Sequence, residues 1–305
     1  MKLNANGIQI EVEDSGGEGR PVVLLIMGLG MQLIAWPDDF VQTLIDAGFR
    51  VVRHDNRDIG LSQGFDEAPA ANLLWQSVRQ RIGLQVRSAY SLQDMANDAL
   101  GVLEALGIRH AHVVGASMGG MIAQRVAASA PDRVTSLVSI MSSSGARQLP
   151  GPRADVAAAL MRRPASRTEA ALVAHSLGLV RLISSPAYPQ EERALTERIT
   201  RGLRRAYRPA GVVRQMLAIG ADSGRHVLLS RIASPTLVLH GDADPLVPMA
   251  CGQDTARRIP GARFVSVAGM GHDMPPPVCD ILLQHIIPFM QTAEKQNGHE
   301  PRQHP

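Results

Sequence analysis

Short apolar runs alternate along this chain with longer stretches in which apolar residues recur at helical spacing. The run over residues 21–26 is continuous, which is typical of a strand buried on both faces of a sheet. A stretch opening at Pro37, and another opening at the capping box Ser91-Leu92-Gln93-Asp94, predict helices between the strands. This alternation favours an α/β fold with a mostly parallel central sheet flanked by helices. Further strands are expected at residues 49–54, 111–114, 134–141, 236–240 and 263–267, and a hairpin over residues 3–12.

The hydrophobic pattern changes after residue 144. Between residues 145 and 225 no convincing strand is found, and the apolar residues recur at helical spacing between Pro164, Pro186 and Pro209. We therefore expect a helical insertion between two strands, which would overhang the strand ends as a lid. The predicted organisation is a core in two parts, residues 1–144 and 226–292, a lid over residues 145–225, and a disordered tail over residues 293–305.

One pentapeptide, Gly115-Ala116-Ser117-Met118-Gly119, lies where an apolar strand gives way to an amphipathic helix. A G-x-S-x-G sequence in this setting indicates a nucleophile elbow, in which a sharp turn exposes the serine. The turn brings neighbouring backbone close together, so positions 115 and 119 tolerate little besides glycine. The alternative is a glycine-rich turn whose serine does nothing. The flanking strand and helix favour Ser117 as a covalent catalyst.

A catalytic serine needs a base to accept its proton and an acid to orient that base. Asp244 and His272 follow Ser117 in the required order, each on a loop just past a predicted strand. Open α/β sheets place their sites at such loops. Asp242 is the alternative acid, but it follows its strand so closely that we expect it to bond the turn backbone. The predicted catalytic residues are therefore Ser117, His272 and Asp244.

Composition narrows the possible functions. The 305 residues are 45% hydrophobic and 19% charged, as in an ordinary globular protein. The net charge of +3 is too small a surplus to predict nucleic-acid binding. No apolar run is long enough for a membrane span, and the first residues lack the apolar segment of a signal peptide, so we expect a cytoplasmic protein. The arginines between Arg147 and Arg231 are interpreted as solvated helix faces, although one of them could guide an anionic substrate.

No motif predicts a metal or a cofactor. Cys251 and Cys279 stand in no metal-ligand spacing and are expected to be free thiols. The sequence has no H-E-x-x-H motif and no P-loop, and Gly28-Leu29-Gly30 lacks the third glycine of a dinucleotide fingerprint. We therefore expect the chemistry to need neither a metal ion nor an organic cofactor.

The elbow, the acid and the base together resemble those of the α/β-hydrolase superfamily, and the resemblance covers nearly the whole chain. Residues 27–30, 35–40 and 53–62 are similar to the branch that includes the aclacinomycin methylesterases, which hydrolyse a carboxylic methyl ester on a polyketide. The resemblance implies the α/β-hydrolase fold and a serine hydrolase that cleaves a carboxylic ester through an acyl-enzyme. Because the lid helices are apolar, we expect a hydrophobic small-molecule ester.

The resemblance also assigns an oxyanion hole. In the methylesterase-like pattern its two backbone N–H groups fall on Leu29 and on Met118, directly after the nucleophile. Many members of the superfamily have a His-Gly pair after the third strand, and here Met27 stands in the place of the histidine. Leu29 could instead only pack under the lid. Candidates for the substrate pocket are Gly28, Met31, Trp36 and Trp75.

Several alternatives stay open at this stage. Serine at the elbow argues against the haloalkane dehalogenases and epoxide hydrolases, which resemble this fold but use aspartate there. A carbon–carbon bond hydrolase or a cofactor-free perhydrolase would use the same three residues. A non-catalytic alternative is a receptor that has the same fold and binds a small molecule. The sequence does not identify the substrate, and it does not distinguish a monomer from a homodimer.

Overall fold

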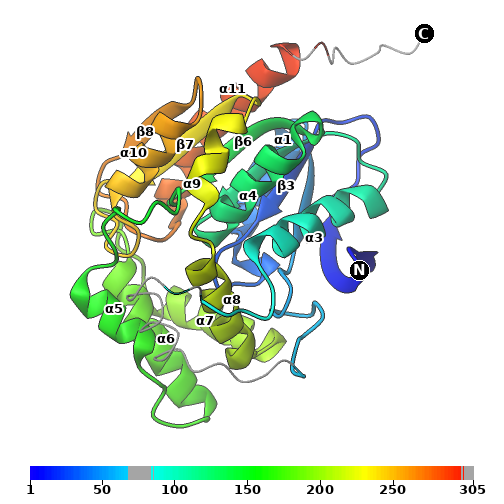
Figure 1. Cartoon of the computed structure of the whole chain (residues 1–305). Coiled ribbons are helices and arrows are strands. Elements are labelled where there is room, and N and C mark those ends of the chain that lie inside the picture. Colours follow the sequence, from blue (N-terminus) through cyan, green and yellow to red (C-terminus); the bar gives the residue numbers. More distant parts are fainter. Residues whose placement is uncertain (68–83, 85, 297, 299–305) are drawn as a thin grey trace.

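The computed structural model describes residues 1–67, 84, 86–296 and 298, and its centre is a sheet of eight strands in the order β1-β2-β4-β3-β5-β6-β7-β8 (Figure 1). The pairs β1–β2 and β2–β4 are antiparallel, and the pairs from β4 to β8 are parallel. The sheet is thus mostly parallel, as the sequence predicts. The strands are β1 Lys2–Ala5, β2 Ile8–Asp14, β3 Val22–Ile26, β4 Arg50–His54, β5 Ala111–Ala116, β6 Val134–Ile140, β7 Thr236–Gly241 and β8 Arg263–Val267.

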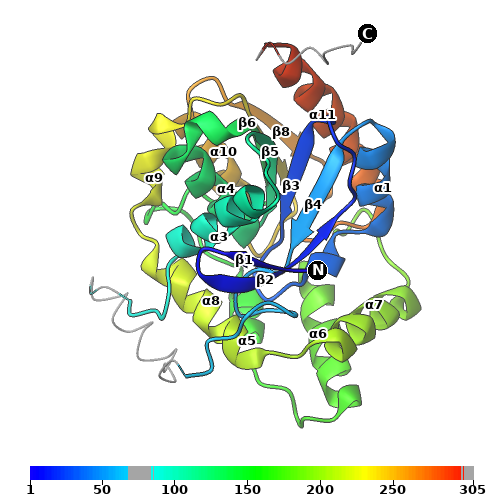
Figure 2. The same ribbon diagram turned by 90° about the vertical axis from the view of Figure 1, so that its right-hand side faces the viewer.

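Helices cover both faces of this sheet (Figure 2). Helices α3 and α4 pack together on one face, and α1 and α11 pack together on the other. The helices of the core are α1 Asp38–Asp46, α3 Leu92–Ala105, α4 Met118–Ser129, α9 Arg225–Leu228, α10 Met249–Arg258 and α11 Pro276–Gln296, and short 3₁₀ turns lie at Leu33–Ala35, Pro131–Arg133 and Leu229–Arg231.

The core is divided between the two faces by the alternation of side chains along each strand. In β3 every residue is buried. Leu24 and Ile26 belong to the hydrophobic cluster under α3 and α4, whereas Val23 and Leu25 belong to the cluster under α1 and α11. A strand that is buried on both faces has to be apolar at every position. This explains the continuous apolar run in the sequence.

Local signals in the sequence form the expected turns and caps. Asn6 and Gly7 join β1 to β2 with φ angles of 51° and 77°, the left-handed conformation that a tight hairpin needs. At the start of α3, Ser91 Oγ accepts a hydrogen bond from Asp94 N at 3.1 Å, and Asp94 Oδ2 accepts one from Ser91 N at 2.8 Å. The predicted capping box is therefore confirmed.

Residues 145–225, which we call the inserted segment, lie between β6 and β7 in the sequence. Its main helices are α5 Ala154–Met161, α6 Glu169–Ile183, α7 Glu192–Arg205 and α8 Pro209–Ala221. These helices gather beyond one end of the sheet (Figures 1 and 2). Hydrogen bonds described below join them to loops that follow β3, β4 and β8, so they lie at the carboxyl ends of those strands.

The last helix is longer than predicted. We expected residues 293–305 to form a disordered tail, but α11 continues to Gln296. Ala293 is buried, and the residues that follow it are strong helix formers, so packing and propensity both extend the helix. The rest of the expected tail, apart from Gly298, lies outside the described residues. No helix within the described ranges is long and apolar enough to cross a membrane.

Candidate active site

Ser117 lies in the sharp turn between β5 and α4. Its backbone has φ 56° and ψ −120°, a conformation that non-glycine residues rarely adopt. The turn leaves no room for side chains on either side. A Cβ on Gly115 would lie 2.2 Å from Gly119 O, and a Cβ on Gly119 would lie 2.0 Å from Ile26 O. Both glycines are therefore required by contact with backbone, as the elbow pattern predicts.

The structure brings the three predicted catalytic side chains together. His272 Nε2 lies 2.9 Å from Ser117 Oγ, and His272 Nδ1 lies 2.7 Å from Asp244 Oδ2. Asp244 and His272 are 6% and 9% exposed, and Ser117 is more open to solvent than either. Three residues from loops far apart in the sequence thus form a continuous chain of hydrogen-bond contacts that ends at an accessible hydroxyl.

The loop after β7 holds Asp244 in its ionised form. Burial by itself would raise the pKa of this carboxyl. The facing imidazoles of His272 and His240 and the N–H of Val247 outweigh that effect, so the pKa lies well below the ordinary value. Asp244 Oδ1 accepts hydrogen bonds from Leu246 N at 2.9 Å and from Val247 N at 2.8 Å, which leaves Oδ2 directed to the histidine.

Asp242, the alternative acid, has a different environment. Its side chain is exposed, and Oδ1 accepts a hydrogen bond from Gly269 N at 2.7 Å. This contact ties the loop after β7 to the loop after β8. Asp242 therefore bonds turn backbone, as expected, and the imidazole of His272 faces Asp244 instead.

The loop that carries His272 is bound to the inserted segment by residues that the sequence analysis missed. His272 N donates to Ile183 O at 2.7 Å, and Gly271 N donates to Ser185 Oγ at 2.8 Å. Asp273 Oδ1 accepts from Ser185 N at 2.9 Å. The pair Ser184-Ser185 just before Pro186 was the available signal, because small polar residues at a helix end commonly bond a neighbouring backbone.

Of the two predicted oxyanion residues, Met118 directly follows the serine, and Leu29 follows a glycine that lies against it. Gly28 is so close that a Cβ on it would lie 3.1 Å from Ser117 Cβ, and Leu29 follows it in the loop after β3. Met118 is the first residue of α4. The N–H of a residue at that position has no acceptor inside its own helix and is free to bind an anion.

Comparison with known proteins identifies the family. The family model of the α/β hydrolase fold matches residues 21–275. This chain belongs to the α/β-hydrolase family. Rhodomycin D methylesterase DnrP of Streptomyces peucetius is 31% identical over 304 residues, which cover 92% of this chain and 95% of that protein. The predicted resemblance to methylesterases is thereby confirmed.

Two further matches are more distant. A 2-hydroxy-6-oxononadienedioate/2-hydroxy-6-oxononatrienedioate hydrolase of a Pseudomonas species is 27% identical over 270 residues, covering 86% of this chain and 85% of that protein. The crystal structure of the enol-lactonase from Burkholderia xenovorans has a TM-score of 0.73 at 22% identity and covers 95% of this chain and 100% of that one. The enol-lactonase shares the fold of this α/β hydrolase.

Of the predicted pocket residues, Gly28 adjoins Ser117 and Met31 is 48% exposed in the same loop of this α/β hydrolase. Trp36 does not line a pocket as predicted. Its side chain is fully buried in the hydrophobic cluster under α1 and α11, and its ring stacks on Phe40 with centroids 5.3 Å apart. An indole next to a proline-opened helix is drawn into the core by its large apolar area. Trp75 lies outside the described residues.

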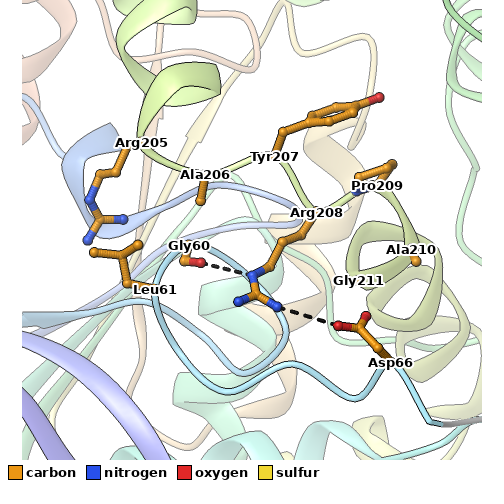
Figure 3. A pocket seen from close by; sticks show the side chains of 10 residues that line it. All are labelled: Gly60, Leu61, Asp66, Arg205, Ala206, Tyr207, Arg208, Pro209, Ala210 and Gly211. Atoms are coloured by element: carbon orange, nitrogen blue, oxygen red, sulfur yellow. Dashed lines mark hydrogen bonds and ion pairs between the residues drawn. The ribbon is translucent and has the colours of Figure 1, made fainter. Parts of the chain in front are cut away.

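A separate cavity of about 470 Å³ lies where the inserted segment meets the loop after β4 (Figure 3). None of the three catalytic candidates lines it. The side chain of Arg208 extends between Gly60 and Asp66, where Nε donates to Gly60 O at 3.0 Å and Nη1 lies 3.9 Å from Asp66 Oδ2. Arg205 donates to Gln32 and to Asp55. Both arginines of this cavity are thus engaged with protein groups. The lining residues are Gly60, Leu61, Asp66, Arg205, Ala206, Tyr207, Arg208, Pro209, Ala210 and Gly211.

Proposed function

We propose that this α/β hydrolase is a serine esterase that cleaves a carboxylic ester of a hydrophobic small molecule. The observation that carries the proposal is the chain of contacts from Ser117 Oγ through His272 to the ionised Asp244, with distances of 2.9 and 2.7 Å. A serine, an imidazole and a carboxylate in this order are the parts needed for acyl transfer. The similarity to rhodomycin D methylesterase favours an ester over other acyl compounds.

In the proposed mechanism His272 Nε2 accepts the proton of Ser117, and Oγ attacks the carbonyl carbon of the ester. The negative charge that develops on the carbonyl oxygen is stabilised by the N–H groups of Leu29 and Met118. One such donor contributes roughly 3–4 kcal/mol in other serine hydrolases. His272 then returns the proton to the leaving alcohol, which departs and leaves an acyl group on Ser117.

The second half repeats these steps with water. His272 accepts a proton from the water, the resulting hydroxide attacks the acyl group, and the acid departs as Ser117 regains its proton. Asp244 stays ionised throughout, because its pKa lies well below the ordinary value. By accepting a hydrogen bond from Nδ1 it fixes the imidazole tautomer that leaves Nε2 free to act as the base.

We also propose that the inserted segment acts as a lid over the acyl site. Ser185, in the middle of the segment, contacts the loop of His272, and Gln215, near its carboxyl end, contacts the loop of Leu29. The buried side of α6 is apolar, with Leu172 and Leu177 among its buried residues. A lid built from apolar helices favours hydrophobic acyl or alcohol groups.

Hydrolysis of p-nitrophenyl esters of graded chain length tests the proposal. The purified protein should release p-nitrophenol, and a fluorophosphonate should label Ser117. The variant Ser117→Ala should lose the label and at least about a thousandfold in kcat, because removal of a triad member leaves little more than the oxyanion contribution. Full activity of Ser117→Ala would contradict the mechanism. Labelling of Ser117 without turnover of any ester would favour the carbon–carbon bond hydrolase or perhydrolase alternatives.

A further inference from the structure

A buried glutamine joins helix α8 of the inserted segment to the loop after β3. Gln215 is 0% exposed. Its Oε1 accepts a hydrogen bond from Gly30 N at 2.9 Å, and its Nε2 donates to Arg57 O at 3.0 Å. A buried amide with both ends bonded has a fixed orientation, because rotation would leave polar atoms unpaired at a cost of about 1–3 kcal/mol. Gln215 therefore offers a fixed acceptor to the N–H directly after Leu29.

The loop is held at three consecutive peptide groups. Asn56 Nδ2 donates to Met27 O at 2.8 Å, Met31 N donates to Gly28 O at 3.2 Å, and Gly30 N donates to Gln215. The N–H of Leu29 belongs to the middle one of these three groups. Within the ranges that the structure describes, the hydrogen bonds include none from Leu29 N. Its neighbours are bonded to protein, and it is left for a ligand.

Helix α8 is itself rigidly attached to the core. Gly211 lies so close to the loop after β4 that a Cβ on it would be 2.1 Å from Asp58 O. Arg214 Nη2 donates to Asp58 Oδ1 at 2.8 Å, and its Nε donates to the other oxygen of the same carboxylate. Val212 packs against Gly30, with its Cγ2 3.0 Å from the position of a Cβ there. One turn of the helix thus contacts both loops.

We propose that Gln215 is a positioning residue that sets the direction of the Leu29 N–H in the oxyanion hole. This inference rests on the proposed function. Gly30 has φ +68°, and its N–H is held by a side chain from the inserted segment rather than by the loop itself. Without that acceptor the peptide group between Leu29 and Gly30 is free to rotate. The preceding peptide group, which carries the Leu29 N–H and shares the Leu29 Cα, then loses a fixed neighbour. Preorganised donors lose most of their effect when their direction is not fixed.

The test is the variant Gln215→Leu, which keeps the apolar volume and removes the acceptor. We expect kcat for a p-nitrophenyl ester to fall about ten- to a hundredfold while KM changes less than about twofold, because the lost interaction acts in the transition state. A trifluoromethyl ketone, which forms an oxyanion on the serine, should bind more weakly by a similar factor. Gln215→Glu keeps an acceptor oxygen for Gly30 N and should retain more activity than Gln215→Leu.

Gln32→Leu is a matched control. Gln32 also joins this loop to the inserted segment, with Nε2 donating to Gly202 O at 2.7 Å and to Ala206 O at 3.1 Å. It contacts none of the three peptide groups around Leu29. Its substitution should lower stability without changing kcat more than about threefold, since the hydrogen bonds lost from Gln32 act on folding rather than on the transition state.

The outcomes separate this inference from the proposed function. If Gln215→Leu keeps the kcat and the inhibitor affinity of Gln32→Leu, or raises only KM, Gln215 does not position the oxyanion hole. The esterase proposal then stands provided that Ser117→Ala is inactive. If Ser117→Ala is active, both fail. Should Gln215→Leu not fold, Gln215→Met gives the same comparison with a flexible side chain of similar length.

Discussion

Three non-glycine residues with positive φ follow the carboxyl ends of parallel strands. They are Ser117, Met141 and Asp58, with φ angles of 56°, 41° and 74°. The fourth such residue among those described is Asn6, in the hairpin between β1 and β2. Such conformations persist only where the surroundings hold them. Ser142 Oγ donates to Ser117 O at 2.7 Å, which supports the elbow from the loop after the neighbouring strand β6. The strained backbone at Ser117 therefore lies where the hydroxyl of the candidate nucleophile is presented.

The two aspartates after β7 have different partners, so their substitutions should have different effects on activity. Asp244 faces His272, whereas Asp242 accepts a hydrogen bond from Gly269 N. Asp244→Asn should lower kcat/KM by roughly ten-thousandfold, as loss of the orienting carboxylate does in a serine protease, because the amide no longer fixes the productive tautomer of His272. Asp242→Asn keeps an oxygen that can accept from Gly269 N, so we expect less than about a tenfold loss. Steady-state kinetics of the two purified variants make the comparison. A larger loss for Asp242→Asn would identify Asp242 as the acid.

At the scale of elements, the start of α4 packs directly on the end of β3. Gly119→Ala would place a Cβ 2.0 Å from Ile26 O, a backbone atom that cannot move without displacing the strand. We expect a loss of about 3 kcal/mol in the free energy of unfolding, together with most of the activity, because the elbow has to shift.

Gly178→Ala is the control for this substitution. Gly178 lies in the middle of α6, and a Cβ there meets nothing within 4 Å. Alanine should stabilise that helix by about 0.5–1 kcal/mol. Urea unfolding of the two variants measures both effects. Equal stability of Gly119→Ala and the unsubstituted protein would contradict the close packing at the elbow.

The elements show what the sequence could predict. Some elements depend only on residues that are neighbours in the sequence, and local patterns predict them. These are the strand at 22–26, the capping box at Ser91 and the elbow. Trp36, Ser185 and Gln215 are different, because what they contact lies on other segments of the chain. Hydrophobic periodicity and secondary-structure propensity do not predict which distant part of the backbone a side chain contacts. Ser117, Asp244 and His272 could be predicted as neighbours because each follows a strand of a parallel sheet, and the carboxyl ends of such strands lie at one edge.

At the scale of the whole molecule, the inserted segment and the core share a buried polar network. Arg214 of α8 pairs with Asp58, which also accepts from Tyr90 Oη at 3.0 Å. Burial alone would raise the pKa of Asp58, but the bonds from Arg214, Phe65 N and Tyr90 lower it, so the carboxylate stays charged. Truncating one member of such a network leaves a buried charge uncompensated, which is strongly destabilising. The inserted segment is therefore an integral part of the folded protein.

A buried histidine at the end of β4 should make the stability of the whole molecule depend on pH. His54 is 1% exposed at the end of β4, so its imidazole is almost completely shielded from water. Burial lowers the pKa of His54 to about 4 from its ordinary value of 6.5. Between these values the unfolded chain binds a proton that the folded protein does not. The folded protein therefore keeps its full unfolding free energy above pH 6.5, where His54 is neutral in both states. It loses part of that free energy as the pH falls towards 4.

For this single group the linkage corresponds to about 2 kcal/mol of unfolding free energy between pH 7 and pH 5. His54→Leu, which cannot take up the proton, should lose less stability over that interval than the unsubstituted protein, by about the same amount. Urea unfolding at the two pH values measures both slopes, and a lower absolute stability of the variant does not affect the comparison. An equal loss of unfolding free energy in the two proteins would contradict this prediction. It would mean that His54 binds a proton as readily in the folded protein as in the unfolded chain, and that burial does not lower its pKa.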